Sequence, residues 1–193
     1  MIAVVDYGIG NIQNVLNALK TLGYEAKLTR LEEDFETATH IILPGVGHFK
    51  DAMQQLNAYS LVPILTTYKD KKPFIGICLG MQLLYDFSEE GNTTGLAFIP
   101  GTVTHIKSDL PVPHLGWNNL MSQHSLLNED VYFIHSFIAP MADNIIAIAD
   151  YGQVIPAIVQ QNNLIGIQFH PEKSGEYGLK ILQQALNGGF IID

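Results

Sequence analysis

A cysteine between two glycines, placed directly after a short apolar run, restricts the fold of this 193-residue chain more than any other feature. Residues 74–77 are typical of a buried parallel strand, and leucines then recur at helical spacing. A nucleophile on such a strand-to-helix elbow projects beyond the sheet edge, and glycines two residues to either side let the turn close without Cβ clashes. Residues 76–80 therefore favour an α/β fold with Cys78 as nucleophile, whereas a buried structural cysteine is the alternative.

The same strand–loop–helix order occurs earlier in the chain. Residues 2–5 and 41–43 are continuous apolar runs followed by glycine-rich loops, and helices are predicted over residues 12–22, 49–56 and 61–71. After about residue 95, short β-like runs dominate, at residues 102–106, 131–135, 145–149, 154–160 and 164–169, before a closing helix over 177–186. We expect one domain over residues 1–193, a doubly wound, mostly parallel α/β sheet with a β-rich second half.

Composition excludes several classes of protein. The hydrophobic fraction of 47% is too high for a disordered chain, and a net charge of −9 without clustered Lys and Arg argues against nucleic-acid binding. Cys78 is the only cysteine, so an intrachain disulfide and a thiolate-rich metal site are excluded. We expect no metal and no organic cofactor. The first residues are typical of a strand rather than a signal peptide, and we expect a cytoplasmic protein.

A cysteine nucleophile needs a histidine base and a group that orients it. Of the seven histidines, His170 ends the apolar run 164–169 and precedes Pro171, which restricts it to extended conformation. Extended geometry places residues i and i+2 on one side, where Glu172 would accept the imidazole N–H and fix its tautomer. We therefore predict a catalytic triad of Cys78, His170 and Glu172.

Oxyanion donors are expected at two places. The helix after Cys78 offers the backbone N–H of Leu79. The loop at residues 44–47 ends a strand, and a glycine-rich turn there can aim an N–H at the reacting carbonyl, although an ordinary tight turn is an equally good interpretation. Gln82 lies four residues after Cys78 on the same helix face, where its amide could hold a polar substrate.

With these motifs in view, the chain resembles the class I, triad-type glutamine amidotransferases over essentially its whole length. The sequences GICLGMQLL at 76–84 and QFHPEKS at 168–174 carry the resemblance, together with YFIHSF at 132–137. Within that class, DYGIGN at 6–11, HLGWN at 114–118 and Lys173 resemble the glutaminase subunits of imidazole glycerol phosphate synthase.

The resemblance implies a flavodoxin-like fold and glutamine hydrolysis through a γ-glutamyl thioester on Cys78. Ammonia would pass to a TIM-barrel cyclase subunit in a heterodimer that makes imidazole glycerol phosphate and aminoimidazole carboxamide ribotide. Three alternatives stay open: a paralogue that supplies ammonia to a surface-sugar amidotransferase, a cysteine hydrolase that acts without a partner, and a catalytically silent binding module.

The resemblance also implies individual roles. The oxyanion donors would be the Leu79 amide and the peptide between Val46 and Gly47. The glutamine site would be lined by Gly47, Gln82, His135 and Ser136. The cyclase interface would contain Asn11, Asn14, Trp117, Tyr132 and Lys173, although Trp117 by itself is typical of a core aromatic. Phe137 stands where many relatives carry tyrosine, and residues 188–193 have no counterpart in the family that we can identify.

Overall fold

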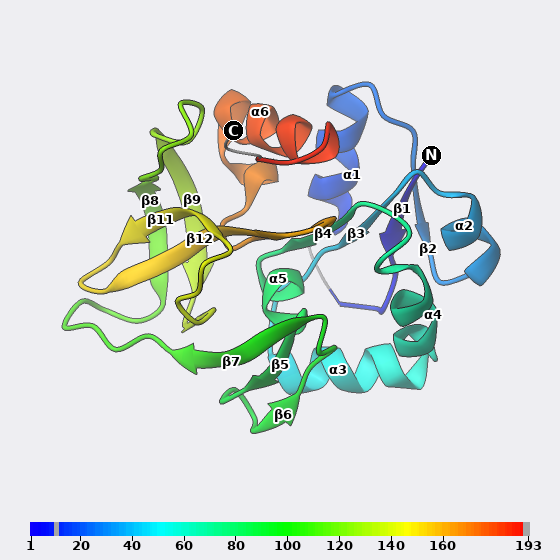
Figure 1. Cartoon of the computed structure of the whole chain (residues 1–193), viewed down its shortest axis with the longest axis horizontal. Helices are drawn as coiled ribbons and strands as arrows, with labels where there is room; N and C mark the ends of the chain where they lie inside the picture. The colour runs from blue at the N-terminus through cyan, green and yellow to red at the C-terminus, as the bar shows by residue number, and fades with distance from the viewer. Residues whose placement is uncertain (10–11, 191–193) are drawn as a thin grey trace.

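A seven-stranded sheet runs through the computed structural model, which describes residues 1–9 and 12–190 (Figure 1). Its strand order is β11-β12-β13-β4-β3-β1-β2. Neighbours from β2 to β13 pair in parallel, and the last two strands continue the sheet in antiparallel pairing. The strand bounds are β1 Ile2–Val5, β2 Ala26–Thr29, β3 His40–Leu43, β4 Phe74–Ile77, β11 Ile145–Asp150, β12 Val154–Gln161 and β13 Leu164–Ile167.

Both faces of the central part of this sheet are covered, which explains why β1, β4 and β13 are continuously apolar. In β1, Ile2 and Val4 pack in one core with helices α1 (Ile12–Thr21) and α6 (Gly175–Leu186). Ala3 and Val5 face the opposite core, which contains side chains of α2 (Glu32–Thr37), α3 (Phe49–Ala58) and α4 (Leu61–Tyr68). The two groups of helices lie on opposite sides of the sheet in Figure 1. The doubly wound, mostly parallel sheet is therefore confirmed.

The second half of the chain adds two smaller sheets. One has four strands in the order β10-β7-β5-β6. The other is the antiparallel hairpin of β8 (His114–Asn119) and β9 (Asp130–His135), in which His114 lies opposite His135 and Trp117 opposite Tyr132. The remaining bounds are α5 Leu79–Leu83, β5 Tyr85–Ser88, β6 Thr93–Thr94, β7 Ile99–His105, β10 Phe137–Ile138 and the 3-10 helix η1 Pro171–Lys173.

The sequence predicted most of these elements, with errors at their ends. The strand at 74–77 has its predicted bounds, whereas the helix predicted over 61–71 ends at Tyr68 and the strand predicted over 164–169 ends at Ile167. Strands β2, β5, β6, β8 and β10 and helix α2 were not predicted. Lys27 and Leu28 of β2 are exposed at the sheet edge, so that strand has no continuous apolar run. Residues 10 and 11, just before the first helix, lie outside the described residues.

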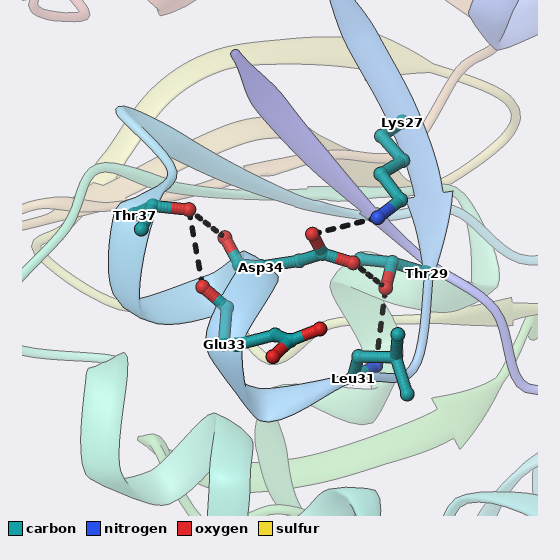
Figure 2. A network of polar contacts seen from close by, with 6 residues as sticks. All are labelled: Lys27, Thr29, Leu31, Glu33, Asp34 and Thr37. Carbon is teal, nitrogen blue, oxygen red and sulfur yellow. Dashed lines mark hydrogen bonds and ion pairs between the residues drawn. The ribbon is translucent and has the colours of Figure 1, made fainter.

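A polar network fixes the unpredicted pair of β2 and α2 (Figure 2). The Asp34 carboxylate accepts from Lys27 Nζ at 2.8 Å and from the Thr29 hydroxyl. The Thr29 hydroxyl in turn accepts the backbone N–H of Leu31 at 3.0 Å, where the chain turns into α2. These side-chain hydrogen bonds help to hold β2 and α2 together. The segment therefore lacks the apolar pattern from which strands are predicted.

Candidate active site

Cys78 lies on a strained elbow between β4 and α5. Its φ of +54° and ψ of −113° are in a region that residues with a Cβ rarely adopt. A Cβ added to Gly80 would lie 1.8 Å from the Leu43 carbonyl oxygen, and one added to Gly76 would lie 2.6 Å from the Gly80 carbonyl oxygen. The predicted reason for the two glycines is therefore confirmed, because neither position has room for a Cβ.

His170 and Glu172 follow β13, the parallel neighbour of β4. The Nδ1 of His170 lies 2.7 Å from Oε1 of Glu172, and the two side chains are only 2% and 1% exposed. His170 is extended as predicted, with φ −99° and ψ 95°. Glu172, however, lies in the 3-10 turn of η1 and not in a continued extended chain. The predicted contact is present, but a turn rather than strand alternation brings the carboxylate back to the imidazole.

The charges around His170 favour its protonated form. Burial lowers the pKa of the imidazole, but the opposing effects of the Cys78 sulfur and the Glu172 carboxylate are larger together and raise the pKa to about 10. The Nε2 atom is buried and bonds to no atom of residues 1–9 or 12–190. With Nδ1–H directed to Glu172, Nε2 is the nitrogen left to exchange a proton with the Cys78 sulfur.

A cavity of about 450 Å³ opens beside Cys78. Of the residues predicted for catalysis, oxyanion binding and substrate binding, all except Glu172 line it. This volume lies in the ordinary range for small-molecule sites. Its predicted lining residues are Val46, Gly47, Cys78, Leu79, Gln82, His135, Ser136 and His170, and Lys173 reaches it as well.

The predicted oxyanion groups lie at one corner of this cavity. The backbone N–H groups of Gly47 and Leu79 donate to no acceptor in the part of the chain that the structure describes. The Tyr7 hydroxyl donates to the Pro44 carbonyl at 2.7 Å, and a Cβ added to Gly45 would lie 2.8 Å from the Gly80 nitrogen. The loop at residues 44–47 is therefore packed directly on the elbow, and Gly47 and Leu79 line the same cavity as Cys78.

The side chains of Gln82 and His135 are bonded within the cavity wall. Gln82 Nε2 donates to the Phe137 carbonyl at 2.8 Å and to Oε1 of Gln168 at 3.0 Å. His135 Nδ1 contacts the same Phe137 carbonyl at 2.9 Å, and its Nε2 lies 3.1 Å from Nδ1 of His114. The amide nitrogen that the sequence suggested as a direct substrate contact of Gln82 thus already has two acceptors in the protein.

Glu90 lines the cavity and was not predicted. It lies in the turn between β5 and β6, where its Oε2 accepts the backbone N–H of Phe49 at 2.8 Å. An acidic residue in a polar turn gives no local sequence signal that it belongs to an active site. Glu90 borders the cavity only because the β5–β6 connection packs against the start of α3. The bond to Phe49 holds the Glu90 side chain at the start of α3, where Glu90 borders the cavity.

The residues implied at a partner interface are partly brought together. The rings of Trp117 and Tyr132 lie 6.0 Å apart, and Lys173 Nζ is 5.9 Å from the Tyr132 ring. Trp117 is 58% exposed, so its interpretation as a core aromatic is wrong. Asn14 lines a second cavity, of about 230 Å³, together with Glu172 and residues of α1 and α6. Asn11 is outside the described residues.

Among residues 1–9 and 12–190, no group of three or more His, Cys, Asp or Glu side chains is arranged to hold a metal ion. In the same residues, no helix has both the length and the apolar composition needed to cross a membrane.

Comparisons with known proteins agree with this geometry. The chain is 60% identical over 193 residues to imidazole glycerol phosphate synthase subunit HisH from Staphylococcus aureus (strain Mu50), and 55% identical over 193 residues to the subunit of the same name from Staphylococcus epidermidis, with all of each chain covered. A crystal structure of a glutamine amidotransferase is 21% identical, has a TM-score of 0.79, and covers 97% of this chain and 100% of its own. The family described as class-I glutamine amidotransferase matches residues 3–187, and the chain belongs to that family.

Proposed function

We propose that this protein is the glutaminase subunit of an imidazole glycerol phosphate synthase. The observation that carries the proposal is the Cys78 elbow in one cavity with the buried His170–Glu172 pair, in a chain that matches relatives of that name over their full length. The subunit hydrolyses glutamine to glutamate and ammonia.

The reaction begins at the sulfur of Cys78. Nε2 of His170 takes the thiol proton, and the thiolate attacks the side-chain amide carbon of glutamine. The oxyanion that forms accepts hydrogen bonds from the Leu79 and Gly47 amides. His170 then gives its proton to the departing ammonia, leaving a γ-glutamyl thioester on Cys78. Water activated by the same imidazole hydrolyses the thioester, while Glu172 keeps Nδ1–H oriented throughout.

The rest of the cavity recognises an amino acid. Glu90 places a carboxylate within it that pairs with the α-ammonium group of glutamine. Gln82, His135 and Ser136 also line the cavity, and Gln82 and His135 both bond the Phe137 carbonyl. Because residue 137 is phenylalanine and not tyrosine, the cavity wall contains no phenolic hydroxyl at this position. The Phe137 ring packs perpendicular to the His105 ring, with centroids 5.1 Å apart.

A partner docks beside the cavity. Leu115 and Trp117 are 56% and 58% exposed on β8, and Ile134 is 40% exposed on the facing strand β9. Large apolar side chains gathered on one face of a hairpin mark an interaction surface. We assign it, with Lys173 and Tyr132, to a TIM-barrel cyclase subunit that consumes the ammonia to make imidazole glycerol phosphate and aminoimidazole carboxamide ribotide.

The test is ammonia release from glutamine, measured for this chain alone and mixed with a histidine-pathway cyclase barrel and its ribotide ligand. We expect strong activation by the barrel, and loss of activity in Cys78→Ala. Activity that is indifferent to the barrel would move the chain to a subunit for another amidotransferase, such as one acting on surface sugars, or to a hydrolase that works alone. Full activity in Cys78→Ala would contradict the mechanism.

Lys173 provides a test of the interface. Lys173→Ala is expected to weaken activation by the barrel more than it lowers turnover without the barrel, because its ammonium group lies at the hairpin edge near Tyr132. Lys180→Ala is the matched control, since Lys180 is an exposed lysine on α6. A larger loss of basal turnover than of activation in Lys173→Ala would remove Lys173 from the interface.

A further inference from the structure

A continuous line of hydrogen bonds runs from Asn118, near the end of β8, through two histidines to the Phe137 carbonyl in the cavity wall. Asn118 Nδ2 lies 2.8 Å from the Asp150 carbonyl oxygen and 3.2 Å from Nε2 of His114. His114 Nδ1 lies 3.1 Å from Nε2 of His135, whose Nδ1 is 2.9 Å from the Phe137 carbonyl oxygen. The line uses every ring nitrogen of both histidines.

The chemistry of the two ends fixes the direction of every bond between them. A carbonyl oxygen only accepts, so the Nδ1 atom of His135 carries the proton and its Nε2 is an acceptor. His114 must then donate from Nδ1, which leaves its own Nε2 as an acceptor. Asn118 meets that need, because an amide nitrogen only donates.

The orientation of the Asn118 amide is fixed independently. Its Oδ1 accepts the backbone N–H of Asn119 at 2.8 Å, so the other branch of the amide is the nitrogen. The two imidazoles are therefore both neutral and both protonated on Nδ1. Burial lowers the pKa of His114 to about 4 and that of His135 to about 3, which agrees with two neutral rings.

Packing holds His114 in the orientation that the line requires. Its ring stacks on Tyr151, with centroids 3.9 Å apart, and on Phe133, with centroids 4.5 Å apart. His114 is 1% exposed, on the inner face of the β8–β9 hairpin whose outer face carries Trp117. His114 itself does not line the cavity, and its hydrogen bond to His135 connects its ring to a side chain that does.

We propose that His114 is a positioning residue of the glutamine site: by donating to Nε2 of His135 it holds that ring as the Nδ1–H tautomer, and so fixes the Phe137 carbonyl and the cavity wall at residues 135–137. The wall depends on this tautomer because the Phe137 carbonyl accepts from both His135 and Gln82. With the proton on Nε2 instead, the bare Nδ1 of His135 would face a carbonyl oxygen and repel it. That the cavity takes glutamine rests on the proposed function, but the tautomer itself does not.

The direct test is ¹⁵N NMR of the full chain labelled in its histidine rings, at pH 7. We expect His114 and His135 each to carry a proton on Nδ1 and none on Nε2, with the His114 signals identified by their absence in His114→Phe. A proton on Nε2 of His135 in the native chain would overturn the proposal whether or not the protein hydrolyses glutamine.

The kinetic test uses two substitutions of His114. His114→Phe keeps a ring between Tyr151 and Phe133 but removes the donor, and we expect the KM for glutamine to rise about 10-fold or more while kcat changes less than about 3-fold. His114→Asn keeps an N–H near the position of Nδ1 and is expected to restore most of the KM. His124→Phe, which removes a histidine away from the cavity, is the control and should leave KM unchanged.

The outcomes separate the two proposals. An unchanged KM in His114→Phe, or an equal loss in His114→Phe and His114→Asn, would contradict a role through the hydrogen bond. Native protein that shows the Nδ1–H tautomers but releases no ammonia, even with the cyclase barrel, would refute the proposed function and leave the tautomer assignment in place.

Discussion

The cavity lining has two parts, the Cys78 wall with His170 and the wall at residues 135–137 with His135, and these two buried rings have opposite acid–base behaviour. His170 is 2% exposed and His135 is 6% exposed, so burial penalises the charged form of both. The pKa of His170 is nevertheless raised to about 10, whereas that of His135 is lowered to about 3. The difference lies in the partners: a carboxylate and a sulfur face His170, and a neutral imidazole and a carbonyl face His135.

The comparison separates two tasks that one residue type performs in the same site. On the wall that carries Cys78, His170 can hold and transfer a proton because anionic groups stabilise its charged form. In the wall at residues 135–137, His135 stays neutral and keeps both nitrogens in hydrogen bonds, so it shapes the cavity without titrating near neutral pH. Burial alone therefore does not assign a histidine to catalysis.

Removing the negative charge of Glu172 should have the largest effect on the difference in acid–base behaviour between His170 and His135. Glu172→Gln keeps the size of the side chain but leaves His170 without its carboxylate, and we expect kcat for ammonia release to fall about 10²–10⁴-fold with a smaller change in KM. Glu176→Gln, at an exposed position on α6, is the control for losing one negative charge elsewhere on the protein. A loss of less than about 10-fold in Glu172→Gln would show that His170 does not depend on the carboxylate.

The elbow that supports the Cys78 wall should be intolerant of a single methyl group. Gly80→Ala places a Cβ 1.8 Å from the Leu43 carbonyl oxygen, and we expect it to lower the free energy of unfolding by about 3 kcal/mol or more. Gly23→Ala is the matched control, because it has open space and carries only the strain of a positive φ, about 1–2 kcal/mol. Urea unfolding measures both, and equal costs would show that the elbow is not closely packed.

The stability of the fold should decrease in acid because His114 and His135 are neutral in the folded protein. Histidines in the unfolded chain titrate near pH 6.5, whereas His114 and His135 bind protons only near pH 4 and 3 when folded. Between pH 6.5 and about 4 the unfolded state thus binds more protons, and stability falls as the pH falls, by about 1.4 kcal/mol per pH unit for each ring. His170 acts in the opposite direction, because its contribution is present below about pH 6.5 and is lost as the pH rises through about 10.

Urea unfolding at several pH values checks this prediction. His114→Phe should have a shallower loss of stability between pH 6.5 and 4.5 than the native chain, because one of the two neutral rings is gone. Parallel curves for the two proteins would mean that His114 is protonated in the folded state, contrary to the geometry of its two hydrogen bonds.

The smallest effect concerns two buried tyrosines on the side of the sheet that carries α5. The Tyr7 hydroxyl donates to the Pro44 carbonyl, whereas the Tyr85 hydroxyl is buried with no partner among residues 1–9 and 12–190. Tyr7→Phe should cost about 1 kcal/mol, and Tyr85→Phe should be neutral or stabilising. Thermal unfolding of both variants tests this, and a Tyr85→Phe protein less stable than Tyr7→Phe would reverse the assignment.

Sequence patterns predicted the Cys78 wall far better than the wall at residues 135–137. The elbow at residues 76–80 is one short segment of the chain, and the His170–Glu172 pair is another. Local patterns therefore predicted each of them. Glu90 and the link between His114 and His135 depend on β5 and β8, which meet the site only after long-range pairing. HLGWN was recognised as a motif, but its polar and glycine residues gave no strand pattern, and nothing local indicates that His114 bonds to a residue 21 positions away.

The most direct test of the central claim is covalent labelling by a glutamine analogue that carries a chloroketone in place of the side-chain amide, with the modified residue located by mass spectrometry. In the complex with the cyclase barrel, we expect one label per chain, on Cys78, formed faster than by a chloroketone without the amino-acid group and slowed by glutamine. Labelling that glutamine does not slow, or that proceeds equally with both reagents, would contradict the assignment of Cys78 as the nucleophile of a glutamine site.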